Sequence, residues 1–168
     1  MAKANKTEQA SLLIPIPATP MGAVERFVVA DVIKIGAKIG NYEVAWIGDN
    51  FKQHFLGVVE ENVPARELPG HTLARYSRDE PIINGMGGTM KKLGPAATAL
   101  SHLFGVIPLG KSGPGLFNGY ANIGYKLSPI DQEPWAVDWS VDDGELSVDA
   151  FPASDPDDWG GGDRVFGG

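Results

Sequence analysis

The residues whose spacing most closely matches a known chemical site run from Gly105 to Ser112, with the sequence GVIPLGKS. This octapeptide fits the phosphate-loop pattern GxxxxGK[ST], in which backbone amides cradle the phosphates and the lysine contacts them. That chemistry needs a strand before the loop and a helix that begins at the lysine. Here the preceding residues have helical spacing, and the following Gly113-Pro114-Gly115 is a poor start for a helix. The flanking residues therefore favour an ordinary loop. Gly110, Lys111 and Ser112 remain candidate anion contacts.

Four further basic residues in the middle of the chain are candidates for an anion-binding face: Arg75, Arg78, Lys91 and Lys92. The two lysines follow a Gly-Met-Gly-Gly segment whose backbone amides could hold an anion as a nest. Cations beside an aromatic side chain would also suit single-stranded nucleic acid. Acidic residues are interleaved with the two arginines, however, which favours a solvated surface of ion pairs over a binding patch.

Acid–base chemistry in this chain would depend on its histidines. His54 with Glu60, and His71 with the nearby arginines, could form an acid–base site if the fold brought them together. The histidines have no metal-ligand spacing such as HxxxH or HExxH, and the chain has no cysteine, which excludes a thiolate metal site and a thiol nucleophile. We therefore expect no metal and no cofactor. Between an enzyme and a protein without catalytic activity, the sequence favours the second.

The charge of the chain is divided along its length. Residues 1–129 hold 13 basic and 10 acidic side chains, whereas residues 130–168 hold one basic and 11 acidic ones, within a net charge of −7. Phosphate groups would be repelled by this acidic last quarter, which argues against a nucleic acid or an anionic membrane as its partner.

Residues 152–168 combine this acidity with aromatic side chains. If they form a docking peptide, the carboxylates would steer it to a basic groove and an aromatic side chain would anchor it there. Alternatively, the aromatic residues fold back onto the sheet as a final edge element. The candidate partner-binding residues are Asp155, Asp157, Asp158, Trp159 and Phe166.

The clearest structural signal is a β-hairpin between Pro134 and Phe151. Hydrophobic and polar residues alternate in both halves, which is the period of a strand with one buried face. Between the halves, Asp143-Gly144 supplies the positive φ angles of a tight turn. Trp135 and Trp139 give one face a large apolar area. We expect this face to floor the core, because burying each large side chain is worth roughly 1.5–3 kcal/mol.

The rest of the chain predicts short elements joined by turns. Strands are predicted for residues 26–35, 42–47, 71–77 and 116–127, and helices for residues 50–61, with Asp49 as N-cap, and 95–104. These elements do not alternate as β-α-β units. They predict an α+β fold with a mainly antiparallel twisted sheet of four to six strands and two or three short helices on one face.

A length of 168 residues fits one domain. We expect an N-terminal arm at residues 1–20, a single α+β domain at 21–151 and an acidic Gly/Asp-rich tail at 152–168. No stretch approaches the ~18–20 apolar residues of a membrane span, and the first residues make a poor signal peptide. A soluble cytoplasmic protein without a membrane partner is therefore expected.

Together these features favour a small binding protein, an adaptor or assembly component, that recognises a protein partner through its acidic, aromatic-bearing C-terminal region. The alternative is a hydrolase-like or phosphate-handling enzyme that uses His54, His71, Glu60 or the Lys111 loop. A third hypothesis is a nucleic-acid binder whose acidic tail occupies its own basic face until it is displaced.

Overall fold

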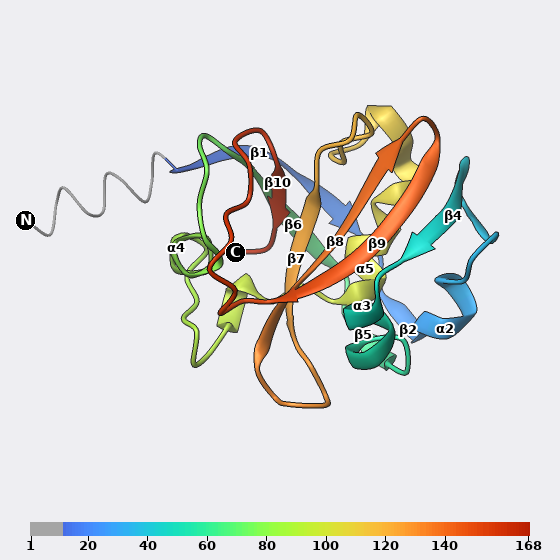
Figure 1. Ribbon diagram of the computed structural model, residues 1–168, viewed down its shortest axis with the longest axis horizontal. Helices are drawn as coiled ribbons and strands as arrows, with labels where there is room; N and C mark the ends of the chain where they lie inside the picture. The colour runs from blue at the N-terminus through green and yellow to red at the C-terminus, as the bar shows by residue number, and fades with distance from the viewer. Residues whose placement is uncertain (1–11) are drawn as a thin grey trace, which may run out of the picture.

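The chain folds around one mixed β-sheet with short helices beside it (Figure 1). The computed structural model describes residues 12–168. Eight strands lie in the order β1-β6-β10-β7-β8-β9-β4-β3, and β2 pairs with β5 in a separate sheet. The strands are β1 (Leu13–Met21), β2 (Val24–Val28), β3 (Lys38–Ile39), β4 (Tyr42–Ile47), β5 (Val59–Val63), β6 (Arg66–Leu73), β7 (Asn122–Leu127), β8 (Pro134–Asp142), β9 (Glu145–Pro152) and β10 (Arg164–Phe166).

The helices of the described chain are all short. The α-helices are α2 (Val29–Val32), α3 (Asp49–His54), α4 (Asp79–Gly85) and α5 (Leu100–Gly105), and the 3-10 helices are η1 (Gly94–Ala96) and η2 (Ile107–Ser112). The predicted α+β class is confirmed. The sheet is larger than predicted, with eight strands. It is mixed, because β4 pairs parallel with β9 and β7 pairs parallel with β10, although its other five ladders are antiparallel as predicted.

The predicted hairpin is confirmed as β8 and β9. The two strands pair antiparallel from Trp135 opposite Pro152 to Asp142 opposite Glu145. Asp143 and Gly144 have φ angles of 50° and 78°, as a tight turn requires. Trp139 on the buried face is fully enclosed, and its indole N–H donates to the Leu103 carbonyl at 3.1 Å.

Both faces of the sheet carry a hydrophobic core, which corrects the expectation of helices on one face only. On one face, Trp139 shares a cluster with Phe51 of α3 and Phe104 of α5. On the other face, Tyr125 shares a second cluster with Ile82 and Ile83 of α4. Each face is apolar at the centre of the sheet, so each needs a cover.

Strand β10 brings the C-terminal segment into the middle of the sheet. Val165 lies opposite His71 of β6 and opposite Ile123 of β7, and Val165 and Phe166 are fully buried. At the other end of the chain, residues 13–20 of the expected arm lie in β1, whose prolines suit an edge strand. The C-terminal segment thus folds back onto the sheet, as the alternative predicted, but β10 lies between β6 and β7 rather than at an edge.

Two predicted elements in the first half of the chain end earlier than expected. The strand predicted for residues 26–35 stops at Val28, where α2 begins. The helix predicted for residues 50–61 stops at His54, and β5 follows because Val58 and Val59 favour an extended chain. Gly48, not Asp49, occupies the N-cap of α3. No helix among residues 12–168 is long and apolar enough to cross a membrane.

The buried indole of Trp139 should carry much of the stability of the hairpin. We expect Trp139→Ala to lower the free energy of unfolding by about 3–5 kcal/mol, because a large cavity would open in the core. Trp46→Ala is the matched control, since Trp46 is 51% exposed, and should cost about 1 kcal/mol or less. Urea unfolding of both variants measures this, and equal losses would contradict the assignment of Trp139 to the core.

Candidate functional site

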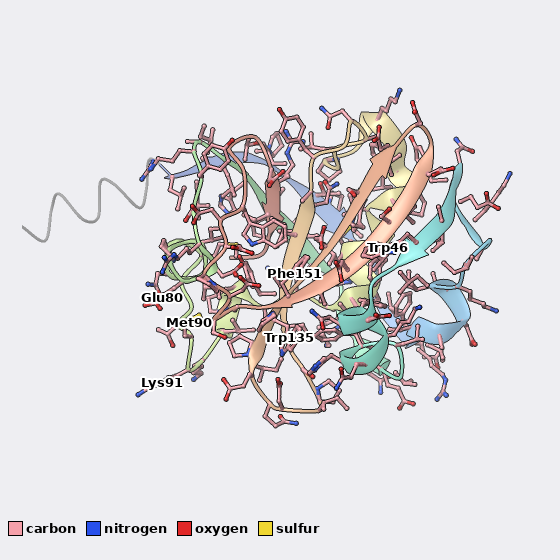
Figure 2. All side chains as sticks on the ribbon, in the orientation of Figure 1. Trp46, Glu80, Met90, Lys91, Trp135 and Phe151 are labelled. Atoms are coloured by element: carbon pink, nitrogen blue, oxygen red, sulfur yellow. The ribbon has the colours of Figure 1, made fainter. Side chains whose placement is uncertain are left out.

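The candidate site is a small acidic pocket where the C-terminal segment passes the start of α4. Its volume is ≈ 150 Å³. Four of its lining residues are aspartates and two are aromatic: Asp79, Asp155, Asp157, Asp158, Phe151 and Trp159. Phe151 lies at the end of β9, near the middle of Figure 2. Of these residues, the sequence had singled out Asp155, Asp157, Asp158 and Trp159.

Trp159 is held in the pocket wall by its backbone and its ring. Its amide donates to the carbonyl of Ser77 at 2.8 Å, and the Ser77 amide donates back at 3.1 Å. The rings of Trp159 and Phe151 meet edge to face with centroids 5.8 Å apart. The indole is therefore presented in one orientation, with little entropy left to lose on binding.

Asp79 forms the buried end of the pocket. Its side chain is 2% exposed, and Oδ1 accepts hydrogen bonds of 2.6 Å from the Tyr125 hydroxyl and from the Trp159 indole N–H. Burial raises the pKa of Asp79 to about 6, against these hydrogen bonds and with help from the charge of Asp155. The carboxylate is thus ionised at neutral pH, but with a cost that a nearby cation would reduce.

Further carboxylates lie on the face of the sheet that carries the acidic pocket. Asp138 of β8 lies opposite Asp149 of β9. Burial raises the pKa of Asp138 well above its usual range, and the charges of Asp149 and Asp163 raise it further. Oδ1 of Asp138 is buried without a hydrogen-bond partner among residues 12–168. Asp163 accepts from the amides of Ala121 and Gly160, both at 2.9 Å, and so shapes the turn before β10.

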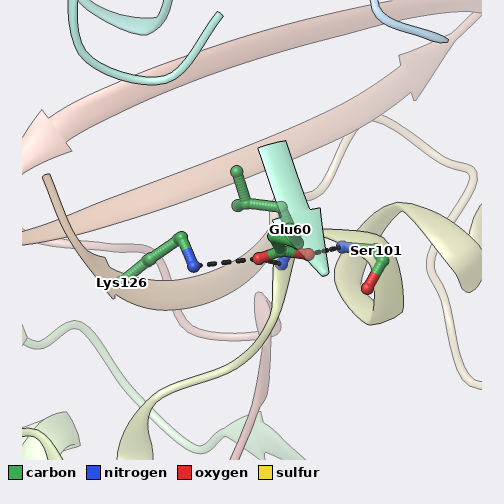
Figure 3. Close-up of polar contacts among 4 residues, drawn as sticks. Glu60, Ser101 and Lys126 are labelled. Atoms are coloured by element: carbon green, nitrogen blue, oxygen red, sulfur yellow. Dashed lines mark hydrogen bonds and ion pairs between the residues drawn. The ribbon is translucent and has the colours of Figure 1, made fainter. Parts of the chain in front are cut away.

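Glu60, a sequence candidate for catalysis, has a carboxylate that is held by backbone hydrogen bonds and an ion pair (Figure 3). Its two carboxylate oxygens accept hydrogen bonds of 2.8 Å from the amides of Leu100 and Ser101, at the start of α5. One oxygen also pairs with Lys126 Nζ at 2.9 Å. Burial alone would raise the pKa of Glu60, but the ion pair and hydrogen bonds outweigh it and lower the pKa. Glu60 therefore joins β5, α5 and β7.

The two histidine candidates have separate partners. His54 Nδ1 lies 2.7 Å from the hydroxyl oxygen of Ser128, and its ring packs on Trp135 with centroids 3.9 Å apart. Ser128 is fully buried, so it is not placed to attack a substrate. His71 Nε2 lies 3.3 Å from the Gly167 carbonyl. In the described part of the chain, no hydrogen bond or ion pair joins any two of His54, Glu60 and His71.

The GVIPLGKS segment does not form a phosphate loop. Residues 107–112 make the 3-10 helix η2, with Gly110 at a φ of 65°, and the next element along the chain is strand β7. The Ser112 hydroxyl donates to the Leu109 carbonyl at 3.2 Å. The amides around Lys111 are therefore not the first turn of an α-helix, which a phosphate loop requires.

The remaining cations are divided between two regions. Lys91 and Lys92 belong to a turn closed by Thr89, and Lys91 lies at the lower left of the molecule in Figure 2. Arg75 and Arg78 lie on either side of Ser77, whose backbone pairs with Trp159. Both arginines are therefore close in the chain to the residue that pairs with the pocket wall. Among residues 12–168, no group of three or more potential ligand side chains is placed to hold a metal ion.

Sequence reasoning missed Asp79 and Phe151. Asp79 stands in an Arg-Asp-Glu run that is typical of a solvated surface, and nothing local indicates its burial. The hydrogen bond to Trp159 spans 80 positions, so only the fold reveals it.

Comparison with protein-family models, with curated proteins and with solved structures gives no match for this chain.

A structural role for Glu60 predicts a specific pattern of stability. Glu60→Gln should lower the free energy of unfolding by about 2 kcal/mol, because it leaves the half-buried ammonium of Lys126 unpaired. Adding Lys126→Met to Glu60→Gln should restore part of this loss. Since the pKa of Glu60 is lowered in the folded state, the advantage of wild type over Glu60→Gln should shrink as the pH falls below about 4.5. Absence of rescue by Lys126→Met would contradict this role.

The raised pKa of Asp79 predicts a loss of stability with rising pH. Between its ordinary value of 3.8 and about 6, the folded state binds more protons than the unfolded state, so the free energy of unfolding falls as the pH rises. The shift corresponds to about 3 kcal/mol at most. Asp79→Asn keeps an oxygen acceptor but removes the charge. Urea unfolding at pH 4 and pH 7 should show a smaller decrease for Asp79→Asn than for wild type, and identical decreases would refute the assignment.

Proposed function

We propose that the protein is a binding protein, an adaptor or assembly component, that recognises a cationic segment of a protein partner at its acidic pocket. One observation carries this proposal: four aspartates and two aromatic rings line a single pocket that has no basic residue in its wall. Such a lining complements the positive charge of a lysine or arginine side chain.

The chemistry of the pocket favours a side chain over a metabolite. Carboxylates form strong charge-assisted hydrogen bonds with ammonium and guanidinium groups, and an indole face attracts cations. The volume of ≈ 150 Å³ lies below the roughly 300–1,000 Å³ of typical small-molecule sites. The occupant that fits is therefore one side chain projecting from a larger partner.

The wider charge distribution supports the same partner class. The single basic residue of the last quarter, Arg164, donates from Nη1 to the Pro114 carbonyl at 2.7 Å. Its strand neighbour Val165 belongs to the core on the pocket side of the sheet, so alternation directs Arg164 to the opposite face. The acidic face is thus not neutralised by this arginine, and its field would steer a basic partner toward it.

A direct test is calorimetric titration of the full chain with an acetylated Gly-Arg-Gly-Arg-Gly amide peptide. We expect saturable binding that weakens with added salt and strengthens between pH 5 and pH 7, as Asp79 ionises with a pKa of about 6. The double variant Asp157→Lys/Asp158→Lys should weaken binding at least tenfold.

The matched control is Asp142→Lys/Glu145→Lys, which makes the same charge change at the exposed hairpin turn. It should change the affinity by less than threefold. Equal weakening by both double variants, or equal binding of a peptide with glutamate in place of arginine, would rule out the pocket as the recognition site.

A further inference from the structure

We infer that a second pocket, on the opposite face of the sheet, binds a small organic carboxylate through Arg164. The pocket lies between β1, from Ile16 to Pro20, and η2 with the loop that follows it. Arg164 of β10 forms part of its wall, and its volume is ≈ 560 Å³. This size falls within the range of small-molecule sites, and the inference goes beyond the proposed recognition of a protein partner.

Arg164 is half-buried and has only neutral acceptors. Nη1 donates to the Pro114 carbonyl at 2.7 Å, and Nε donates to the Thr72 hydroxyl at 3.3 Å. None of the ion pairs among residues 12–168 involves Arg164. A guanidinium carries five N–H donors, so three remain for a ligand. Burial also lowers the pKa of Arg164, which an anion beside the guanidinium would reverse.

The fold separates Arg164 from the nearest carboxylate in sequence. Asp163 accepts from the amides of Ala121 and Gly160, and its side chain therefore serves the turn on the other side of the strand. Partly buried charges are normally paired, and here the pairing group is absent from the pocket wall. An anionic ligand would supply it.

The loop that accepts from Arg164 is held in place by the core. A side chain at Gly115 would put its Cβ 2.7 Å from the Trp139 indole, so the loop packs directly on that ring. Asn122 accepts from the Leu116 amide at 2.8 Å and donates to the Leu116 carbonyl at 2.9 Å. The Pro114 carbonyl, and with it the guanidinium, is thus positioned before any ligand arrives.

The pocket wall selects a carboxylate with a short hydrocarbon body. A single guanidinium matches the two oxygens of one carboxylate. The hydroxyls of Thr19 and Ser112 are the polar side chains beside it, and Ile16, Leu109 and prolines form the apolar wall. A dianionic phosphate would leave a second charge against this apolar surface, at a cost. Ser112 thus contributes to an anion site without a phosphate loop.

The probe is hexanoate, titrated into the full ¹⁵N-labelled chain and followed by amide chemical shifts. We expect saturable shifts at Gly113 and Arg164, and binding of hexanol at least tenfold weaker because it lacks the charge. Leu109→Glu, at a 42% exposed position on the pocket wall, should weaken hexanoate binding at least tenfold by repulsion. Ile130→Glu makes the same change of charge at a 62% exposed loop position and should change it less than twofold.

Arg164→Lys keeps the positive charge but removes the fork of donors, and it should weaken hexanoate binding at least fivefold. The inference is overturned if hexanoate gives no saturable shift, if hexanol binds as tightly as hexanoate, or if inorganic phosphate binds more tightly than hexanoate. Leu109→Glu keeps the test decisive if Arg164→Lys fails to fold, because Leu109 is an exposed residue.

Discussion

Strand β10 joins two parts of the eight-stranded sheet, β1 with β6 on one side and β7, β8, β9, β4 and β3 on the other. Among the described strands, no other ladder connects these two parts. On one side it pairs antiparallel with β6, and on the other it pairs parallel with β7. Its residues lie within reach of both neighbours because Gly70, opposite Phe166, has no side chain to collide with the aromatic ring or with Ile16. The Thr98 hydroxyl then donates to the Phe166 carbonyl at 2.7 Å. Without this short strand, β1 and β6 would lose their hydrogen-bonded contact with the rest of the sheet.

The same strand gives the two faces of the molecule their different chemistry. Arg164 is the first residue of β10, whereas Asp163 precedes the strand and its carboxylate accepts from the amides of Ala121 and Gly160. The two side chains are therefore separated although they are neighbours in sequence. Asp163 orders the turn beside the acidic pocket, while Arg164 enters the pocket against β1 and η2. The acidic pocket with aromatic walls and the apolar-walled pocket that contains Arg164 thus lie on opposite faces of the sheet, on either side of this segment of the chain.

The sequence predicted what depends on local periodicity. Alternation and an Asp-Gly turn indicated the hairpin and the burial of Trp139, because a strand with one covered face repeats every two residues. No alternation of hydrophobic and polar residues predicts strand β10, because its residues are followed by glycines. Its partner strands are also distant in sequence. The burial of Asp79 was hidden for the same reason, as it depends on Tyr125 and Trp159. Clustering of acidic residues near Trp159 was visible, but the pocket they line was not.

Native-state hydrogen exchange of the amides of residues 164–167 tests the central role of β10 most directly. The Arg164 amide donates to the Ala121 carbonyl at 3.0 Å and the Gly167 amide donates to the Pro69 carbonyl at 2.9 Å. If β10 joins the sheet, these amides exchange only through the same rare opening that exposes the amides of β7 and β8. Exchange at the rate of an unstructured peptide would show that the tail is free, and both proposed pockets would then lose their framework.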